Sequence, residues 1–158
     1  MALTEEQRTR EVHRWGDLVY RLALARTASV PDAEDVFQEV FLRYFRHEER
    51  FQSDEHRKAW LIRCTVNRAK SLTASPWRKR TVPLETAWEV GVEDDYREVY
   101  RAVLSLPGKY RAVIHLHYFE GLSVMEIAQM LQVPEGTVKS QLSRGRALLR
   151  EMLKEVEL

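Results

Sequence analysis

The segment from Ser123 to Arg146 constrains the fold of this chain more than any other. Ser123 and Glu126 have the spacing of a capping box, which predicts that a short helix begins there. A turn at residues 132–134 follows, and a second helical pattern begins near Glu135. Two short helices joined by a tight turn predict a helix-turn-helix. The residues expected to close the core between these helices are Ala128, Val133, Val138 and Leu142.

The second helix of such a motif enters the major groove of DNA, and its N-terminal half contacts base edges. The outward positions of this helix carry donors and short polar groups, which suit phosphate and base contacts. An ordinary helical hairpin with a solvated basic face is the alternative for this segment alone. The candidate DNA-binding residues are Thr137, Lys139, Ser140, Gln141 and Arg144.

The rest of the chain is also predicted to be helical, because apolar residues recur at spacings of three and four. Only six glycines and five prolines interrupt 158 residues. Helices are expected around residues 12–22, 31–46, 54–74, 96–106 and 109–119. The stretch from Ser75 to Asp95 has no period and two prolines, so it predicts a linker. We therefore expect an all-α protein with two small helical domains, residues 1–75 and 96–158, joined by an acidic linker at 76–95.

The net charge of +1 hides strong blocks of charge. From Arg57 to Arg80 there are eight basic residues and no acidic one, and from Gly136 to Arg150 there are four basic residues and no acidic one. The segments 31–55 and 81–98 are acidic. Two basic stretches separated by an acidic one predict two anion-binding surfaces on two bodies.

Two further groups of residues lie in the first domain. Asp35, Gln38 and Glu39 are spaced i, i+3 and i+4, which places them on one side of a helix. There they could bind a basic partner helix, or they could form a solvated face. The basic run includes Trp60, and basic residues interleaved with aromatic ones suit single-stranded nucleic acid. A solvated basic helix with Trp60 in the core is the alternative.

Catalytic, metal-binding and membrane functions are not expected. The five histidines are scattered, and the single cysteine excludes an internal disulfide framework and a multi-cysteine metal site. We therefore predict no catalysis and no cofactor. No run approaches the roughly 18 apolar residues of a membrane span, and the N-terminus lacks the apolar core of a signal peptide. These features predict a cytoplasmic chain that does not insert into membranes.

The combination of these segments resembles a bacterial RNA polymerase sigma factor of the extracytoplasmic-function (ECF) group. Residues 32–46 resemble the region 2 helix that docks on the largest core subunit, and its D-x-x-Q-E pattern falls on Asp35, Gln38 and Glu39. The segment AWLIRCTVNRAK resembles the part of region 2 that opens and reads the −10 promoter element. There Asn67 matches the asparagine that helps to hold a flipped base, whereas Ser71 departs from a frequent aspartate. The resemblance implies −10 contacts from Trp60, Arg63, Asn67, Arg68 and Lys70.

The segment from Leu106 through the motif GTVKSQLSRGR resembles region 4, which binds the −35 element. Lys139, Ser140 and Arg144 occupy its reading positions. The resemblance implies an initiation factor that gives core RNA polymerase promoter specificity, with promoter DNA and an anti-sigma factor as further partners. Two alternatives stay open from the sequence: a stand-alone helix-turn-helix regulator that binds duplex DNA without polymerase, and an interaction module that has lost promoter function.

Overall fold

The computed structural model describes residues 3–47, 51–73 and 97–156, and within these ranges it contains helices and no strand. The expected all-α fold is therefore confirmed. The predicted linker at 76–95 lies outside the described residues. The elements are α1 (Glu5–Thr27), α2 (Val30–Arg46), α3 (Asp54–Thr73), α4 (Arg97–Ser105), α5 (Gly108–Ile114), η3 (His115–Phe119), α6 (Val124–Leu131) and α7 (Glu135–Val156).

Side chains of the sequence itself fix several helix ends. The Thr4 hydroxyl accepts a hydrogen bond from the Gln7 backbone N–H, and the Ser29 hydroxyl accepts one from Asp32 at the start of α2. The predicted capping box at α6 is present, since Ser123 and Glu126 bond each other's backbone N–H groups. These bonds satisfy N–H groups that have no partner within the helix.

The helix predicted over residues 109–119 changes character within its length. It is α-helical in α5 and continues as the π-helix η3. The backbone N–H of Glu120 donates to the His115 carbonyl, five residues earlier and 3.0 Å away, and Gly121 follows with a φ of +72°. The hydrogen bonds of a π-helix span one more residue than those of an α-helix, and that extra residue carries no signal in the apolar pattern.

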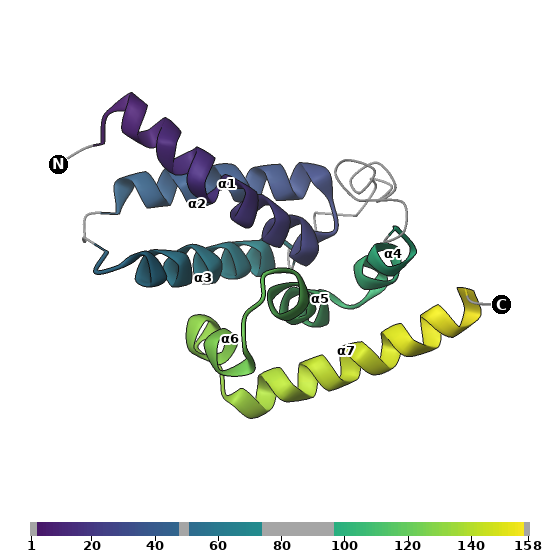
Figure 1. Cartoon of the computed structure of the whole chain (residues 1–158). Coiled ribbons are helices and arrows are strands. Elements are labelled where there is room, and N and C mark those ends of the chain that lie inside the picture. Colours follow the sequence, from purple (N-terminus) through teal and green to yellow (C-terminus); the bar gives the residue numbers. More distant parts are fainter. Residues whose placement is uncertain (1–2, 48–50, 74–96, 157–158) are drawn as a thin grey trace.

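In the first half of the chain, α1 packs against both α2 and α3 (Figure 1). Their facing sides carry the apolar stripes that the sequence predicts, because residues three and four apart lie on one side of a helix. The fully buried side chains there include Val19, Leu22, Val36, Val40, Leu61 and Ile62. This three-helix unit holds α2 and α3, which carry the candidate residues of the first half, in place.

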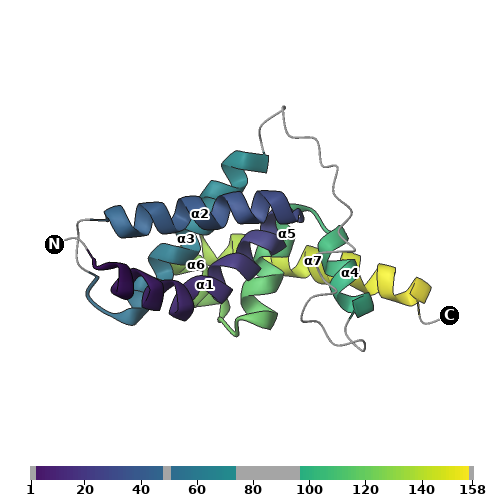
Figure 2. The ribbon, with the colours of Figure 1, turned by 90° about the horizontal axis from the view of Figure 1, so that it is seen from above.

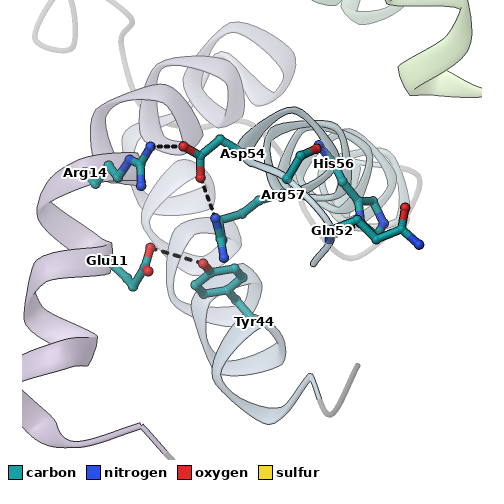
Figure 3. Close-up of polar contacts among 8 residues, drawn as sticks. Glu11, Arg14, Tyr44, Gln52, Asp54, His56 and Arg57 are labelled. Atoms are coloured by element: carbon teal, nitrogen blue, oxygen red, sulfur yellow. Dashed lines mark hydrogen bonds and ion pairs between the residues drawn. The ribbon is translucent and has the colours of Figure 1, made fainter. Parts of the chain in front are cut away.

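Polar contacts join the three helices at one end of this unit (Figure 3). Arg14 of α1 and Arg57 of α3 both donate to the carboxylate of Asp54. The hydrogen bond from Arg14 holds the pKa of Asp54 below its ordinary value. The hydroxyl of Tyr44 donates to Glu11, and burial together with the Glu11 charge raises the pKa of Tyr44 to about 12. These contacts fix the N-terminal end of α3 against its neighbours.

In the second half, α5 and α6 both pack against α7, and α4 also lies beside α7. The two halves touch each other as well, with α1 against α5 and α3 against α6 (Figures 1 and 2). Buried apolar residues of both halves form one continuous cluster. Within the described ranges, no helix has the length and the apolar character needed to cross a lipid bilayer.

Candidate functional site

The helix-turn-helix predicted at residues 123–146 consists of α6, a turn and α7. Gln132 turns the chain in the left-handed conformation, with a φ of 58°. Val138 and Leu142 are 0% and 1% exposed, so they anchor α7 to the rest of the second half. Gly145 permits a close approach, because a Cβ at this position would lie 3.2 Å from Cγ1 of Ile114. The opposite side of α7 is thereby directed to solvent.

The structure brings the five candidate DNA-binding residues together on α7, away from its buried side. Thr137, Lys139, Ser140 and Arg144 are exposed, and Gln141 is half-buried. Arg146 adds to the basic charge of this helix, and its Nη1 donates to the Tyr118 hydroxyl 3.1 Å away. This hydrogen bond was not predicted, because it depends on how η3 packs beside α7. The result is a polar, basic helix surface held by an apolar inner face.

The three residues predicted to dock on a partner helix all lie on α2. Asp35 and Gln38 are exposed, whereas Glu39 is half-buried. Glu39 forms ion pairs with Arg43, at 3.3 Å, and with Arg68 of α3. One of the three residues, Glu39, is therefore already paired with a neighbouring helix of the same chain.

A hollow of about 520 Å³ lies between α1 and α2 beside these residues. Gln38 borders it, and its walls include Val12, Gly16, Tyr20 and Phe37. This hollow had no signal in the sequence, because its walls come from two helices.

The five candidate residues for the −10 element are on α3 but differ in their surroundings. Asn67 and Lys70 are exposed, and Arg63 is half-buried. Arg68 is paired with Glu39, so one residue of the basic set contacts one residue of the acidic set. Trp60 packs against an aromatic cluster within the first half, with ring centroids 5.0–5.9 Å apart; its partners are Tyr44, His47 and Phe51.

An apolar groove of about 440 Å³ lies between α4, η3 and α7. Val99, Tyr118 and Phe119 are its exposed large apolar residues, and Leu149 and Leu153 line it from α7. This groove had no signal in the sequence either. Its walls come from three separate elements, so its presence depends on how α4, η3 and α7 pack together.

Family models match both halves of the chain. The model described as "Sigma-70 region 2" matches residues 12–79, which include most of α1 and all of α2 and α3, and the model "Sigma-70, region 4" matches residues 96–149. The order of the two matches along the chain is the order predicted from the motifs.

Relatives that align with most of this chain are ECF RNA polymerase sigma factors. The ECF RNA polymerase sigma factor SigW of Bacillus subtilis (strain 168) is 31% identical over 163 residues, covering 89% of this chain and 85% of SigW. The ECF RNA polymerase sigma factor SigE of Mycolicibacterium smegmatis is 36% identical, covering 90% of this chain and 60% of SigE.

Two solved structures share the fold. One is the sigma factor RpoE in complex with the anti-sigma factor NepR from Bartonella quintana, with a TM-score of 0.66, 22% identity and coverage of 92% of this chain and 96% of the matched chain. The other is CnrH in complex with the cytosolic domain of CnrY, with a TM-score of 0.70, 24% identity and coverage of 96% of this chain and 90% of the matched chain.

Proposed function

The chain belongs to the ECF RNA polymerase sigma factors, and from this premise we propose how its residues divide the work of transcription initiation. A sigma factor directs core polymerase to promoters, so this chain is an initiation factor. The stand-alone regulator is not favoured. Polymerase docking, −10 recognition and −35 recognition fall to separate sets of side chains, with residues 1–75 and 96–158 as the two working domains and 76–95 as the linker.

The −35 element is read by α7. The observation that carries this assignment is the division of α7 into a buried side, with Val138 and Leu142, and an outer side with exposed Thr137, Lys139 and Arg144. An Arg or Lys side chain reaches the acceptors of guanine in the major groove, and short hydroxyls contact phosphates or bases. Ser140 and Gln141 complete this surface.

The −10 element is opened and held by α3. Asn67 and Lys70 are exposed on one helix, so an amide that pairs with a base edge stands close to a charge that neutralises phosphate. A base held outside the stack offsets the few kcal/mol that unpairing and unstacking cost. Arg63 and Arg68 add positive charge beside them. Trp60 contributes through the aromatic cluster that supports α3, and Arg68 reaches DNA only after exchanging its contact with Glu39.

Core polymerase is bound through α2, by Asp35, Gln38 and Glu39. Carboxylates and an amide on one helix face accept hydrogen bonds from basic side chains of a partner helix. Two modest DNA contacts tethered through one polymerase gain from effective concentration, so neither half needs to bind DNA tightly alone. The factor itself performs no catalysis and works in the cytoplasm with the polymerase. An anti-sigma factor is a further partner, by analogy with the complex of RpoE and the anti-sigma factor NepR, whose sigma factor has a similar fold.

Run-off transcription with core polymerase on pooled genomic fragments tests this assignment. Lys139→Ala with Arg144→Ala should weaken −35-dependent initiation and leave core binding intact. Gln38→Ala with Glu39→Ala should abolish core binding while the second half still contacts DNA weakly. Lys154→Ala, an exposed change at the far end of α7, and Glu5→Ala on α1 are matched controls. An exchange of the two phenotypes would show that the division of labour is wrong.

A further inference from the structure

Glu39 lies between two arginine side chains that come from neighbouring helices. The helices α2 and α3 pack side by side (Figure 1). Oε1 of Glu39 accepts a hydrogen bond from Nη2 of Arg43, one turn later on α2, at 3.3 Å. The other carboxylate oxygen, Oε2, forms an ion pair with Nε of Arg68 on α3. Because one carboxylate is shared by two guanidinium groups, it neutralises the charge of Arg43 only in part.

The side chain of Arg43 also reaches α3. Burial raises the pKa of the Cys64 thiol above its ordinary value, against the opposing effects of the Arg43 charge and of a side-chain hydrogen bond with Arg43. Cys64 lies three residues before Asn67 and four before Arg68, so these side chains are neighbours on the surface of α3. Arg43 belongs to α2, but it therefore lies beside the part of α3 that carries Asn67.

Arg43 is held in place and still accessible. Its side chain is 57% exposed, whereas the side chains of Glu39 and Arg68 are 32% and 31% exposed. A guanidinium carries five N–H donors, so contacts with one carboxylate oxygen and one sulfur leave donors for a further acceptor. A side chain that is already ordered loses less rotamer freedom when it binds a ligand. Arg43 is thus prepared to bind an anion that approaches from solvent.

Stability alone gives a poor account of these charges. An exposed ion pair one turn apart on a helix contributes little to the free energy of folding. The charge of Arg63 also acts on Cys64, so three guanidinium groups lie around the single carboxylate of Glu39. Guanidinium groups bind phosphate oxygens with two parallel hydrogen bonds. An excess of positive charge at a partly exposed place therefore suits a phosphate.

We propose that Arg43 of α2, which Glu39 holds beside α3, belongs to the −10 interface and binds a backbone phosphate of the melted strand next to Asn67. This inference rests on the assignment of α3 to the −10 element. It extends the DNA-binding surface onto α2, outside the five residues that the sequence predicts. A phosphate contact positions the strand and is independent of the base sequence, whereas Asn67 contacts a base.

The salt dependence of DNA binding tests the proposal. The complete chain is bound to core polymerase, and the DNA is a promoter fragment from the run-off assay whose −10 non-template strand is single-stranded. Arg43→Gln should weaken binding and lower the slope of log K against log salt concentration by about 0.7, the value for one phosphate of a single strand. The ratio of wild-type to variant affinity should then shrink about 2.6-fold between about 50 and 200 mM salt. Fragments with a changed −10 sequence should show the same effect.

Two variants serve as matched controls. Arg46→Gln removes an equal charge from an exposed position three residues further along α2, and it should leave the slope unchanged. Arg43→Lys keeps the positive charge and should keep most of the slope. The affinity of Arg43→Gln for core polymerase should equal that of the wild type. If it fell as much as the affinity for DNA, Arg43 would belong to the polymerase interface and the proposal would be wrong.

Neutral methylphosphonate linkages, placed one at a time in the single strand, identify the phosphate. At one position the neutral linkage should weaken binding of the wild type and leave that of Arg43→Gln unchanged, because the variant has already lost this contact. Additive effects at every position would overturn the proposal. Asn67→Ala provides the comparison that separates the two hypotheses. An effect of Asn67→Ala without one of Arg43→Gln contradicts the phosphate contact alone, whereas no effect of either contradicts the assignment of α3.

Discussion

Arg111 is predicted to be the polar side chain on which the second half depends most. In Arg111→Leu, four backbone carbonyls, those of Ala25, Arg26, Leu104 and Leu106, lose their donor in a place where the side chain is 3% exposed. A hydrogen bond contributes about 1 kcal/mol net, more when the donor is charged, and an unpaired buried acceptor adds a desolvation cost. Part of this loss of stability is offset, because water hydrates some of the carbonyls at the end of α1 and because leucine keeps apolar packing in the same space. We expect the free energy of unfolding to fall by about 3–5 kcal/mol.

Urea denaturation followed by far-ultraviolet circular dichroism measures this change. Because a chain of this size melts about 2–4 °C lower per kcal/mol lost, thermal unfolding should shift by roughly 6–20 °C. Arg111→Lys keeps the charge but replaces the planar guanidinium by a single ammonium group. Its free energy of unfolding should therefore fall by an intermediate amount. Arg144→Leu, on the exposed face of α7, should change stability by less than about 0.5 kcal/mol. If the free energy of unfolding of Arg111→Leu fell by less than about 1 kcal/mol, the argument that four buried carbonyls depend on Arg111 would be refuted.

Three further predictions concern stability. Burial would raise the pKa of Glu120, but hydrogen bonds from His115 and Arg21 lower it from its ordinary value of 4.5 to about 2, so its contribution is present above pH 4.5 and is lost as the pH falls towards 2. The difference in unfolding free energy between wild type and Glu120→Gln, at most roughly 3 kcal/mol, should therefore shrink over that range in acid titrations. Gly145→Val forces a side chain against Ile114 and should cost about 1–3 kcal/mol in urea denaturation, where an unchanged midpoint would contradict the close packing. Ser123→Ala removes the cap of α6 and should cost about 1 kcal/mol by the same method, whereas Ser123→Asp should keep most of the stability.

The local structure of this protein could be predicted from its sequence. The apolar spacing in the first half predicts α1, α2 and α3, and the spacing of Ser123 and Glu126 predicts the start of α6. Both signals are local, because a helix buries residues three and four apart and its end needs a nearby acceptor. The inward direction of Val138 and Leu142 followed from the same spacing.

The contacts between distant segments could not be predicted. Nothing distinguishes Arg111 in the sequence from the other basic residues, because its partners Ala25 and Arg26 are 86 and 85 positions away. The surroundings of Trp60 were left open between nucleic acid and core, and its ring contacts with Tyr44 and Phe51 depend on how α2 meets α3. The role of each residue in binding polymerase or DNA remains a prediction.

The π-helical turn η3 makes the spatial direction of the whole DNA-reading motif depend on a single residue. In an α-helix each residue advances the chain by about 100°. Removal of one residue from His115–Phe119 would restore the spacing of a regular α-helix. Every element after it would then be rotated by roughly a quarter of a circle or more relative to α1. A shortened chain could thus keep both halves folded and still present α7 to the wrong side of the DNA.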